Sequence, residues 1–351
     1  MPLYLAFAVG FLGFVSISAA RVVLSLYALD LGAQPFAVGM LVAMFYAFPL
    51  LLSWPLGALS DRIGPRWPLL FGAVCGACGM AIPYFLPTLP AMYVAAALSG
   101  LALAIMHVIV QNLVGVISKP AQRARNFSNF SMLGAATNFV GPLVAGIAID
   151  HTSYATACLF VVVIWLASGV FLLARGKVLP GSTGRSASTT RILDTLANRE
   201  IWRTLTTSSL AQLGTDLFQF YLPIHGHAVG LSATAIGAVL AAFALASFAV
   251  RVVLTRLIAR FGEEKLLAYS FYLGAVGFLM VPFCNTALPL ALVSFVFGIG
   301  MGCGQPITLM LMFSHSPQGR SGETLGLRLT ANNVMRVLGP AAFGSVGSAF
   351  G

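Results

Sequence analysis

The segment Gly57-Ala58-Leu59-Ser60-Asp61-Arg62-Ile63-Gly64-Pro65-Arg66 combines two glycines, an Asp-Arg pair and a proline at the junction of two apolar runs. A weaker copy runs from Thr255 to Gly262, 198 residues later, and keeps the arginine and the last glycine as Arg260 and Gly262. The same spacing relates Gly32 to Gly230, Gly39 to Gly237, Gly100 to Gly298, Gly141-Pro142 to Gly339-Pro340, and Gly146 to Gly344. A spacing held without slippage indicates two copies of one structural unit, and internal repeats are typical of secondary transporters.

The composition predicts that both copies lie in a lipid bilayer. Of the 351 residues, 59% are hydrophobic and 8% are charged, and the mean hydropathy is +0.93. A soluble domain cannot bury that much apolar surface, and a helix needs about 20 apolar residues to cross the hydrocarbon. Eleven such runs are predicted, at residues 4–29, 36–58, 68–86, 91–117, 127–149, 154–174, 204–228, 233–254, 265–283, 288–313 and 325–349.

The basic residues in the loops and at the edges of these runs predict the orientation of the chain. They follow every second run: Arg62 and Arg66; Lys119, Arg123 and Arg125; Arg175, Lys177, Arg185, Arg191, Arg199 and Arg203; Arg256, Arg260 and Lys265; and Arg320. The alternate loops hold no Lys or Arg. This bias is the positive-inside rule, so we expect a multi-pass protein of the plasma (inner) membrane with a cytoplasmic N-terminus and central loop. The net charge of +10 therefore does not indicate a nucleic-acid partner.

The repeat also predicts the domain organisation. We expect an N-terminal six-helix bundle over residues 1–174, a cytoplasmic linker over 175–203, and a C-terminal bundle with five helices over 204–351. Gly351 corresponds to Ser153, which directly precedes the sixth run, so the repeat partner of that run is absent. Either the chain is truncated or the protein has eleven spans. Truncation is favoured, because a helix without its packing partner exposes groups suited to burial.

The stretch Gly57–Arg66 resembles the signature loop of the major facilitator superfamily, Gly-x-x-x-Asp-Arg-x-Gly followed by two basic residues. Pro65 departs from the first basic position, and the second copy has Ala259 where the acid stands in the first. Together with the repeat and the basic linker, the resemblance covers the whole chain. It implies an all-α polytopic fold of two pseudo-symmetric six-helix bundles, here without the twelfth helix, that rock about a central site.

The resemblance further implies that this loop is a conformational latch. Asp61 lies at the cytoplasmic end of its helix, where a carboxylate can meet the positive N-terminal end of the helix that begins near Thr324. The residues expected in the latch are Gly57, Asp61, Arg62, Gly64, Arg66 and Arg328. The alternative is that the motif only fixes topology and loop geometry.

A second stretch, Gly141-Pro142-Leu143-Val144-Ala145-Gly146, resembles the Gly-Pro-x-x-Gly-Gly segment of drug–proton antiporters. Such glycines and the proline let this helix pack tightly against the opposite half, and the resemblance favours export over import. Because Gly339-Pro340 repeats the motif, symmetric helix packing is the alternative. The arginine expected in the fourth helix of such antiporters is Ala96 here, so other residues must couple the proton, or no proton is coupled.

Ionisable residues inside predicted spans are costly and are therefore candidates for function. Asp216 is the acid well inside a run, and Arg21 lies in the first run; the resemblance places both helices at the cavity. In the functional interpretation, Asp216 binds and releases the coupling proton while Arg21 sets its pKa or attracts an anionic substrate. In the other, the two form a permanent ion pair that closes the outer half.

The remaining candidates for the substrate cavity are polar residues in predicted helices: Tyr27, His107, Gln111, Gln212, Gln219, Gln305, Asn332 and Arg336. Arg336 attracts an anionic substrate group or satisfies carbonyls freed near Pro340, and His107 is equally consistent with a hydrogen-bonded structural residue. Arg251 is expected to extend its side chain to the membrane interface.

These features predict a monomeric transporter of a small organic molecule, most simply a proton-coupled exporter that works by alternating access. Uptake by symport or facilitation is the nearest alternative. A transporter-like sensor or an inactive truncated remnant is the alternative of another class. An enzyme is not expected, since no metal cluster, phosphate-binding loop or nucleophile–base arrangement is present. Without a phosphate-binding loop, ATP drive is not expected either, and we expect no metal and no cofactor.

Overall fold

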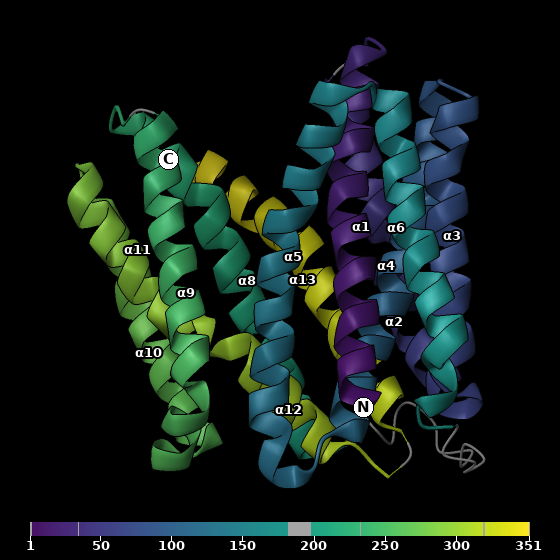
Figure 1. The fold of residues 1–351 in the computed structure, drawn as a ribbon. Coiled ribbons are helices and arrows are strands. Elements are labelled where there is room, and N and C mark those ends of the chain that lie inside the picture. The colour runs from purple at the N-terminus through teal and green to yellow at the C-terminus, as the bar shows by residue number, and fades with distance from the viewer. Residues whose placement is uncertain (1, 34, 182–197, 232, 319, 351) are drawn as a thin grey trace. The chain divides into compact units, whose positions relative to one another are not determined.

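The computed structural model describes residues 2–33, 35–181, 198–231, 233–318 and 320–350 (Figure 1). Within these ranges the regular structure is helical, and the predicted all-α fold is confirmed. The helices of the first repeat are α1 (Pro2–Asp30), α2 (Pro35–Ile63), α3 (Arg66–Phe85), α4 (Leu89–Ile117), α5 (Arg123–His151) and α6 (Tyr154–Arg175), with short 3₁₀ turns η1 (Pro120–Gln122) and η2 (Gly176–Val178). Most of the predicted linker, residues 182–197, lies outside the described residues.

The helices of the second repeat are α8 (Arg199–Ala228), α9 (Ala233–Phe261), α10 (Glu263–Met280), α11 (Ala287–Gly302), α12 (Gly304–His315) and α13 (Ser321–Phe350), with the 3₁₀ turn η3 (Val281–Phe283). The run predicted over 288–313 is divided into α11 and α12. Pro306 explains the division, because it has no N–H for the carbonyl of Gly302, four residues earlier.

The chain forms two compact units that do not follow the sequence halves throughout. Unit 1 comprises residues 1–118, 133–192 and 316–330, and unit 2 comprises 119–132, 193–315 and 331–351. The exchanged segments are equivalent in the repeat, because 119–132 becomes 317–330 when 198 is added. The first part of α5 therefore packs in unit 2 and the first part of α13 in unit 1, while the division into two bundles at the linker stays a prediction.

Four glycines show the repeat in the backbone. Gly32, Gly64, Gly230 and Gly262 have φ of 78° to 80°, and they are the described residues with positive φ. Each follows the end of a helix, where glycine reverses the chain without the steric cost of a side chain. Two pairs separated by 198 residues thus make the same turns after α1 and α8, and after α2 and α9.

The repeat also governs helix packing within each unit. In unit 1, α2 packs on α4, and in unit 2 the equivalent α9 packs on α11. A Cβ added to Gly100 would lie 2.5 Å from the carbonyl oxygen of Phe45, and one added to Gly298 would lie 2.5 Å from that of Phe243. Phe45 and Phe243 are themselves 198 residues apart. Both helix pairs therefore depend on a glycine at the same crossing point.

We expect Gly100→Ala and Gly298→Ala to lower the thermal unfolding midpoint of the detergent-solubilised protein, because each methyl forces a helix pair apart. Gly134→Ala in α5 is the matched control, since a Cβ there meets nothing within 4 Å. An alanine in a helix interior is favoured over glycine by about 1 kcal/mol, so the control should be neutral or stabilising. Equal midpoints for all three variants would contradict the close packing at Gly100 and Gly298.

The surface of the helices is apolar over wide areas. Phe139, Tyr272 and Leu279 are 70% to 73% exposed, and large exposed hydrophobic side chains occur on many other helices. Patches of this kind are rare on soluble monomers and suit contact with lipid. Nine helical stretches among the described residues are long and apolar enough to cross a membrane: Pro2–Asp30, Ala43–Ile63, Arg66–Phe85, Leu89–Ile117, Pro120–His151, Tyr154–Val178, Ala238–Phe261, Glu263–Phe283 and Ala287–His315. The two predicted spans outside this set, α8 and α13, carry Asp216 and Arg336 near their middles.

Candidate functional site

The carboxylate of Asp61, in the last turn of α2, binds the start of α13 within unit 1. Its Oδ1 accepts a hydrogen bond from the backbone N–H of Gly322 (3.1 Å), and its Oδ2 accepts one from that of Glu323 (3.0 Å). The first N–H groups of a helix have no partner inside the helix and carry partial positive charge. An aspartate at this point therefore satisfies two of them and also neutralises the end of the helix.

Asn112 of α4 joins Asp61 to α13 by a second route. Its Nδ2 donates to Asp61 Oδ1 (3.0 Å), and its Oδ1 accepts from the hydroxyl of Ser321 (2.6 Å). Asn112 is 6% exposed, so both hydrogen bonds lie away from water. One carboxamide thus bridges α2, α4 and α13.

Glycines allow α2 and α13 to approach so closely. A Cβ at Gly57 would overlap the carbonyl oxygen of Gly322, and one at Gly326 would overlap that of Ser53. Neither carbonyl can move aside without disturbing its own helix. Gly57, the first residue of the signature stretch, therefore allows the backbone of α13 to lie directly against α2.

The rest of the predicted latch lies around this contact. Glu323 binds Arg320 through both of its carboxylate oxygens (2.7 and 2.8 Å) and accepts a longer hydrogen bond from the indole N–H of Trp54 (3.4 Å).

The other residues of the predicted latch lie in different surroundings. Arg328 lies further along α13 and is 1% exposed. Arg62 is exposed, Gly64 makes the turn after α2, and Arg66 donates to the carbonyl of Leu173 (3.4 Å).

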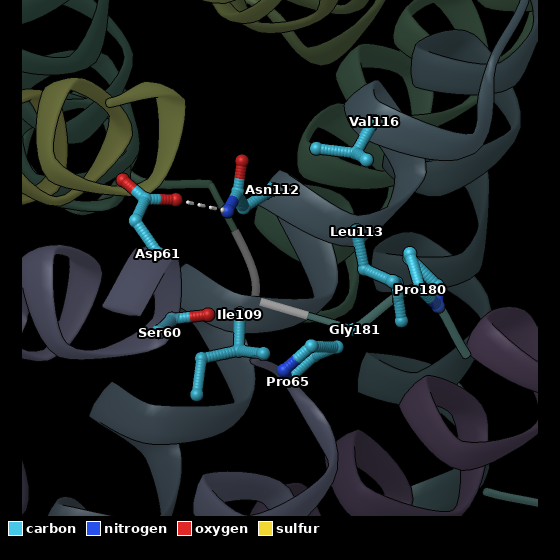
Figure 2. Close-up of a pocket in the computed structure, with 9 residues that line it drawn as sticks. All are labelled: Ser60, Asp61, Pro65, Ile109, Asn112, Leu113, Val116, Pro180 and Gly181. Atoms are coloured by element: carbon cyan, nitrogen blue, oxygen red, sulfur yellow. Dashed lines mark hydrogen bonds between the residues drawn. The ribbon is translucent and has the colours of Figure 1, made fainter. Parts of the chain in front are cut away.

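A small pocket adjoins Asp61 and Asn112 (Figure 2). Its volume is about 30 Å³, and it is lined by Ser60, Asp61, Pro65, Ile109, Asn112, Leu113, Val116, Pro180 and Gly181. A space of this size holds about one water molecule. The pocket is therefore too small for an organic substrate.

A contact in unit 2 corresponds to the α2–α13 contact in the repeat. Ser53 and Gly326 become Arg251 and Ser128 when the offset of 198 is applied. The Ser128 hydroxyl donates to the backbone carbonyl of Arg251 (2.6 Å), which joins α5 to α9. The guanidinium of Arg251 extends the contact, since its Nη1 donates to the carbonyl of Ser131 (3.3 Å).

Arg251 also compensates for the break between α11 and α12. Its Nε donates to the carbonyl of Gly302 (3.1 Å), the group that Pro306 leaves without a helical partner. The prediction that Arg251 extends to the membrane interface is therefore wrong. Sequence reasoning missed this role because nothing in the local sequence links a proline in one helix to an arginine in another.

We expect Arg251→Met to lower the thermal unfolding midpoint by several degrees, because it leaves the carbonyls of Gly302 and Ser131 without their charged donor. Hydrogen bonds to charged groups contribute about 1.5–3 kcal/mol each. Arg256→Met in the same helix is the control, since it removes an equal charge from an exposed position. If both variants unfold at the same temperature, the hydrogen bonds of Arg251 to Gly302 and Ser131 do not stabilise the fold.

The candidates for substrate and proton binding in the second repeat form a connected polar cluster in unit 2. Asp216 Oδ2 accepts from Arg336 Nε (3.1 Å), and Asp216 Oδ1 accepts from Gln212 Nε2 (2.8 Å). Gln212 Oε1 in turn accepts from Gln305 Nε2 (2.6 Å). The cluster thus joins the middle of α8 to α12 and α13.

Asn332 lies one turn before Arg336 and continues the cluster. It is 5% exposed, and its Oδ1 accepts from the hydroxyls of Ser208 (3.2 Å) and Ser209 (3.4 Å) in α8. Gln219, by contrast, is exposed and lies on α8 beyond Asp216.

The candidates in the first repeat make local contacts within unit 1. Arg21 donates to the hydroxyl of Tyr46 in α2 (2.9 Å), and Tyr27 stacks on Tyr154 of α6 with 5.5 Å between ring centroids. His107 of α4 meets the ring of Phe14 edge-on. Gln111 is 3% exposed, and its Oε1 has no hydrogen-bond partner within the described part of the chain.

The interpretation in which Asp216 pairs with Arg21 stays a prediction, because the two residues belong to different compact units. The ion pair that the structure gives to Asp216 is with Arg336. Sequence reasoning placed Arg336 in the cavity without pairing it to Asp216.

The packing motif of α5 contacts α1 of its own unit. A Cβ at Gly141 would lie 2.5 Å from the Cβ of Ser18, whereas one at Gly146 meets nothing within 4 Å. Pro142 lies inside α5. The repeat partners Gly339 and Pro340 belong to α13, but their burial lies outside the described part of the structure.

The polar pairs of unit 2 have neutral equivalents in unit 1. Asp216 and Arg336 correspond to Ser18 and Asn138, and the Ser18 hydroxyl donates to Asn138 Oδ1 (3.1 Å). Gln212 corresponds to Phe14 and Gln305 to His107, and the rings of Phe14 and His107 contact each other edge-on. Both repeats therefore bring the same positions together, but the second repeat carries the charged pair.

Comparison with known proteins identifies the family. The family model described as Major Facilitator Superfamily matches residues 6–340. The chain belongs to the major facilitator superfamily. A search of curated proteins found no match.

Solved structures share the major facilitator fold with this chain. The E. coli fucose:proton symporter is 16% identical, with a TM-score of 0.81 over 99% of this chain and 92% of that one. A bacterial homologue of the iron transporter ferroportin, in an outward-facing state, is 15% identical with a TM-score of 0.82 over the same shares. The human organic anion transporter MFSD10 is 16% identical with a TM-score of 0.73, over 97% and 93%. At these identities the likeness shows the fold alone.

Membership of the superfamily and the nine apolar stretches among the described residues make this chain a multi-pass membrane transporter. Within the described residues, no group of three or more His, Cys, Asp or Glu side chains is arranged to hold a metal ion. Asn112 and Ser321 complete the contact at Asp61 and were not among the predicted site residues. The one available signal was the position of Asn112 near the end of a predicted span.

Proposed function

We propose that this transporter couples the movement of a small organic molecule to that of protons, and that Asp216 binds the coupling proton. The observation that carries the proposal is the ion pair of Asp216 with Arg336 in the middle of α8 and α13. Charged groups at such depth cost several kcal/mol and persist where they serve transport or face a water-filled cavity. The side chains of Arg336 and Asp216 are 39% and 20% exposed, which fits a cavity better than a sealed core.

The first repeat argues against a purely structural role for this pair. Ser18 and Asn138 make the equivalent contact between α1 and α5 without any charge. Helix packing at these positions is therefore satisfied by a neutral hydrogen bond. The costlier ion pair in the second repeat calls for a role beyond packing, and a carboxylate that takes up a proton supplies one.

Protonation of Asp216 would switch the cluster between two states. With the carboxylate ionised, the charge on Arg336 and the amide of Gln212 hold it in place. A proton on the carboxylate removes its charge and so weakens the attraction between Asp216 and Arg336. The pair thus provides a local change in charge that can bias a two-state protein.

The contact of Asp61 with α13 is proposed to act as the latch at the cytoplasmic end. The carboxylate holds the N-terminus of α13 against α2 and α4, and the latch residues Gly57, Gly64, Arg62, Arg66 and Arg328 form its surroundings. The assignment of this contact to the cytoplasmic side rests on the basic loops, which favour a cytoplasmic N-terminus and central loop in the plasma membrane. We expect a monomer and no need for ATP.

Two directions of transport are proposed. Export by antiport, which the stretch Gly141–Gly146 favours, requires that the substrate and the proton compete for one site. Uptake by symport is the second candidate, and Arg336 favours it, because a cation beside Asp216 repels cationic substrates and attracts anionic ones. The comparison proteins include a proton symporter and an organic anion transporter, which suit the second candidate.

Everted membrane vesicles that trap a pH-sensitive dye test the proposal. Compounds added outside should alkalinise the lumen if they exchange for protons, and acidify it if they enter with protons. Vesicles with the Asp216→Asn variant, inserted at an equal level, should give neither signal. If no compound in a broad panel moves protons through the correctly inserted wild type, proton coupling is wrong.

A further inference from the structure

We infer that Arg21 binds an anionic group of the transported molecule, a carboxylate, at a site that α1, α2 and α5 form within unit 1. The inference rests on the proposed function, because it names the charge of the small organic molecule that is moved. It follows from the depth of Arg21 in α1, from the places of the acids of unit 1, from the repeat, and from the hydrogen-bond donors beside Arg21.

Arg21 lies well inside the apolar part of α1. It precedes the end of the helix at Asp30 by nine residues, or about 14 Å. Its Nη1 donates to the hydroxyl of Tyr46 (2.9 Å), which follows the start of α2 at Pro35 by eleven residues, or about 16 Å. The guanidinium is therefore held at this depth and does not extend to the membrane surface.

The acids in the described part of unit 1 lie at helix ends, away from the depth of Arg21. Asp30 is exposed at the end of α1, and Asp150 is exposed near the end of α5. Asp61 binds the start of α13, and Glu323 forms an ion pair in the first turn of that helix. An arginine stays charged at physiological pH, and a charge inside the bilayer is costly unless a counter-ion is supplied. Within the described part of unit 1, no side chain supplies one to Arg21.

The second repeat packs its helices without this charge. Arg21 and Tyr46 correspond to Gln219 and Ala244 when 198 is added. Even so, α8 packs on α9 as α1 packs on α2. A neutral side chain at the position of Arg21 is therefore compatible with the packing, and the charge in the first repeat calls for another role.

Hydrogen-bond donors lie next to Arg21 in the same unit. Ser18 precedes Arg21 by three residues, so the two side chains are neighbours on one face of α1. The Ser18 hydroxyl donates to Asn138 Oδ1 of α5 (3.1 Å). This bond occupies the acceptor of the carboxamide, and its N–H groups have no partner in the described part of the chain, where Asn138 is exposed. The site thus offers a cation and amide donors, which together suit an anion.

The charge of the site selects the solute. A cation is repelled by Arg21, and a neutral molecule leaves the arginine without a counter-ion. An anion supplies the counter-ion that the described part of unit 1 lacks. One N–H group of the guanidinium binds Tyr46, and the others have the planar arrangement that matches both oxygens of a carboxylate. A carboxylate is therefore the anionic group we expect.

The first test measures the electrostatic potential at the site and needs no substrate. Asn138→Cys is introduced into the full chain after its five native cysteines are replaced by alanine. Its reaction rates with an anionic (sulfonatoethyl) and a cationic (trimethylammonioethyl) methanethiosulfonate are compared in detergent. Adding Arg21→Gln should lower the ratio of the anionic to the cationic rate about tenfold, because a positive charge within one helical turn is lost. Arg203→Gln, which removes an exposed charge from α8, should leave the ratio unchanged.

The second test measures binding with the native cysteines in place. Thermal stabilisation of the purified full chain is measured with benzoate, benzamide and benzylamine, with hexanoate, hexanamide and hexylamine, and with gluconate, glucose and N-methylglucamine. At least one acid should stabilise the wild type more than its neutral and amine counterparts do. Arg21→Gln should weaken binding of that acid about tenfold, and Arg21→Lys should weaken it less, since lysine keeps the charge without the planar N–H groups. Asn138→Asp should also weaken it, because an aspartate beside Arg21 is an internal counter-ion, whereas Arg203→Gln should not.

A rate ratio that is the same with and without Arg21 overturns the inference, as does a panel in which no acid is preferred. A rise in the rate ratio on adding Asp216→Asn also overturns it, because Asp216 would then be the counter-ion of Arg21. Failure of the proposed function gives a different result. If Arg21→Gln loses the acid while Asp216→Asn still moves protons with it in everted vesicles, the anion site stands and proton coupling at Asp216 is wrong.

Discussion

Asp216→Asn is expected to abolish transport driven by a pH gradient, while exchange of the solute across the membrane should continue. Asparagine preserves the size of the side chain and can still accept a hydrogen bond from Gln212 or Arg336. It cannot bind or release a proton in the physiological range. A cycle that requires the proton therefore loses its drive, whereas binding and reorientation of the loaded protein need not be lost.

Two measurements on one batch of proteoliposomes check this result. Uptake under an imposed pH gradient should fall to the level of empty liposomes, and exchange of labelled for unlabelled solute should stay within a few-fold of the wild type. Asp150→Asn, at an exposed acid near the end of α5, should behave as the wild type. Equal loss of both activities in Asp216→Asn would show a structural role instead.

The repeat offers a stricter control for folding. The double variant Asp216→Ser with Arg336→Asn copies the neutral pair that Ser18 and Asn138 already form in α1 and α5. It should insert and purify as the wild type does and should show no proton-driven transport. A double variant that does not fold would indicate that the charges are needed for packing.

Asp61→Asn is expected to have the second largest effect, through the start of α13. The carboxylate accepts from the N–H groups of Gly322 and Glu323, and an amide offers one oxygen in place of two. A hydrogen bond with a charged partner contributes about 1.5–3 kcal/mol. Loss of one such bond shifts a two-state equilibrium by about tenfold or more, since 1.4 kcal/mol is a factor of ten.

Accessibility of a single cysteine reports this shift. Leu113 lines the pocket beside Asp61 and is 3% exposed, so Leu113→Cys in a protein without other cysteines should react slowly with a membrane-impermeant maleimide. Adding Asp61→Asn should raise the reaction rate about tenfold. Asp150→Asn should leave the rate unchanged. An unchanged rate with Asp61→Asn would mean that the contact does not hold the closed state.

Much of the fold could be predicted because the determinants are periodic or repeated. Apolar runs fix the helices, and the offset of 198 residues pairs turns such as Gly64 and Gly262, which adopt the same positive φ. The division of the tenth run at Cys303 could not be predicted with the same ease. A proline in a span either kinks or breaks it, and the outcome depends on whether a neighbour such as Arg251 satisfies the freed carbonyl.

The candidate site was predicted where a motif carries it and missed where tertiary contacts decide. The approach of Asp61 to the start of α13 follows from the signature stretch and the helix dipole. The bridge through Asn112 and the pairing of Asp216 with Arg336 depend on which helix faces contact one another. The repeat aligns Arg336 with Asn138 and Asp216 with Ser18. This alignment shows that the two pairs are equivalent, but it does not show that the members of either pair contact each other, which is known only from the packing of the helices.

The most direct test of proton coupling at Asp216 is the number of protons bound when substrate binds. Calorimetric titration of the purified protein with the compound that moves most protons in everted vesicles, in two buffers of different ionisation enthalpy, measures that number. The account predicts a change of about one proton per bound substrate in the wild type, release for exchange and uptake for co-transport, and no change in Asp216→Asn. Absence of a change in the wild type, or an equal change in both proteins, would contradict it.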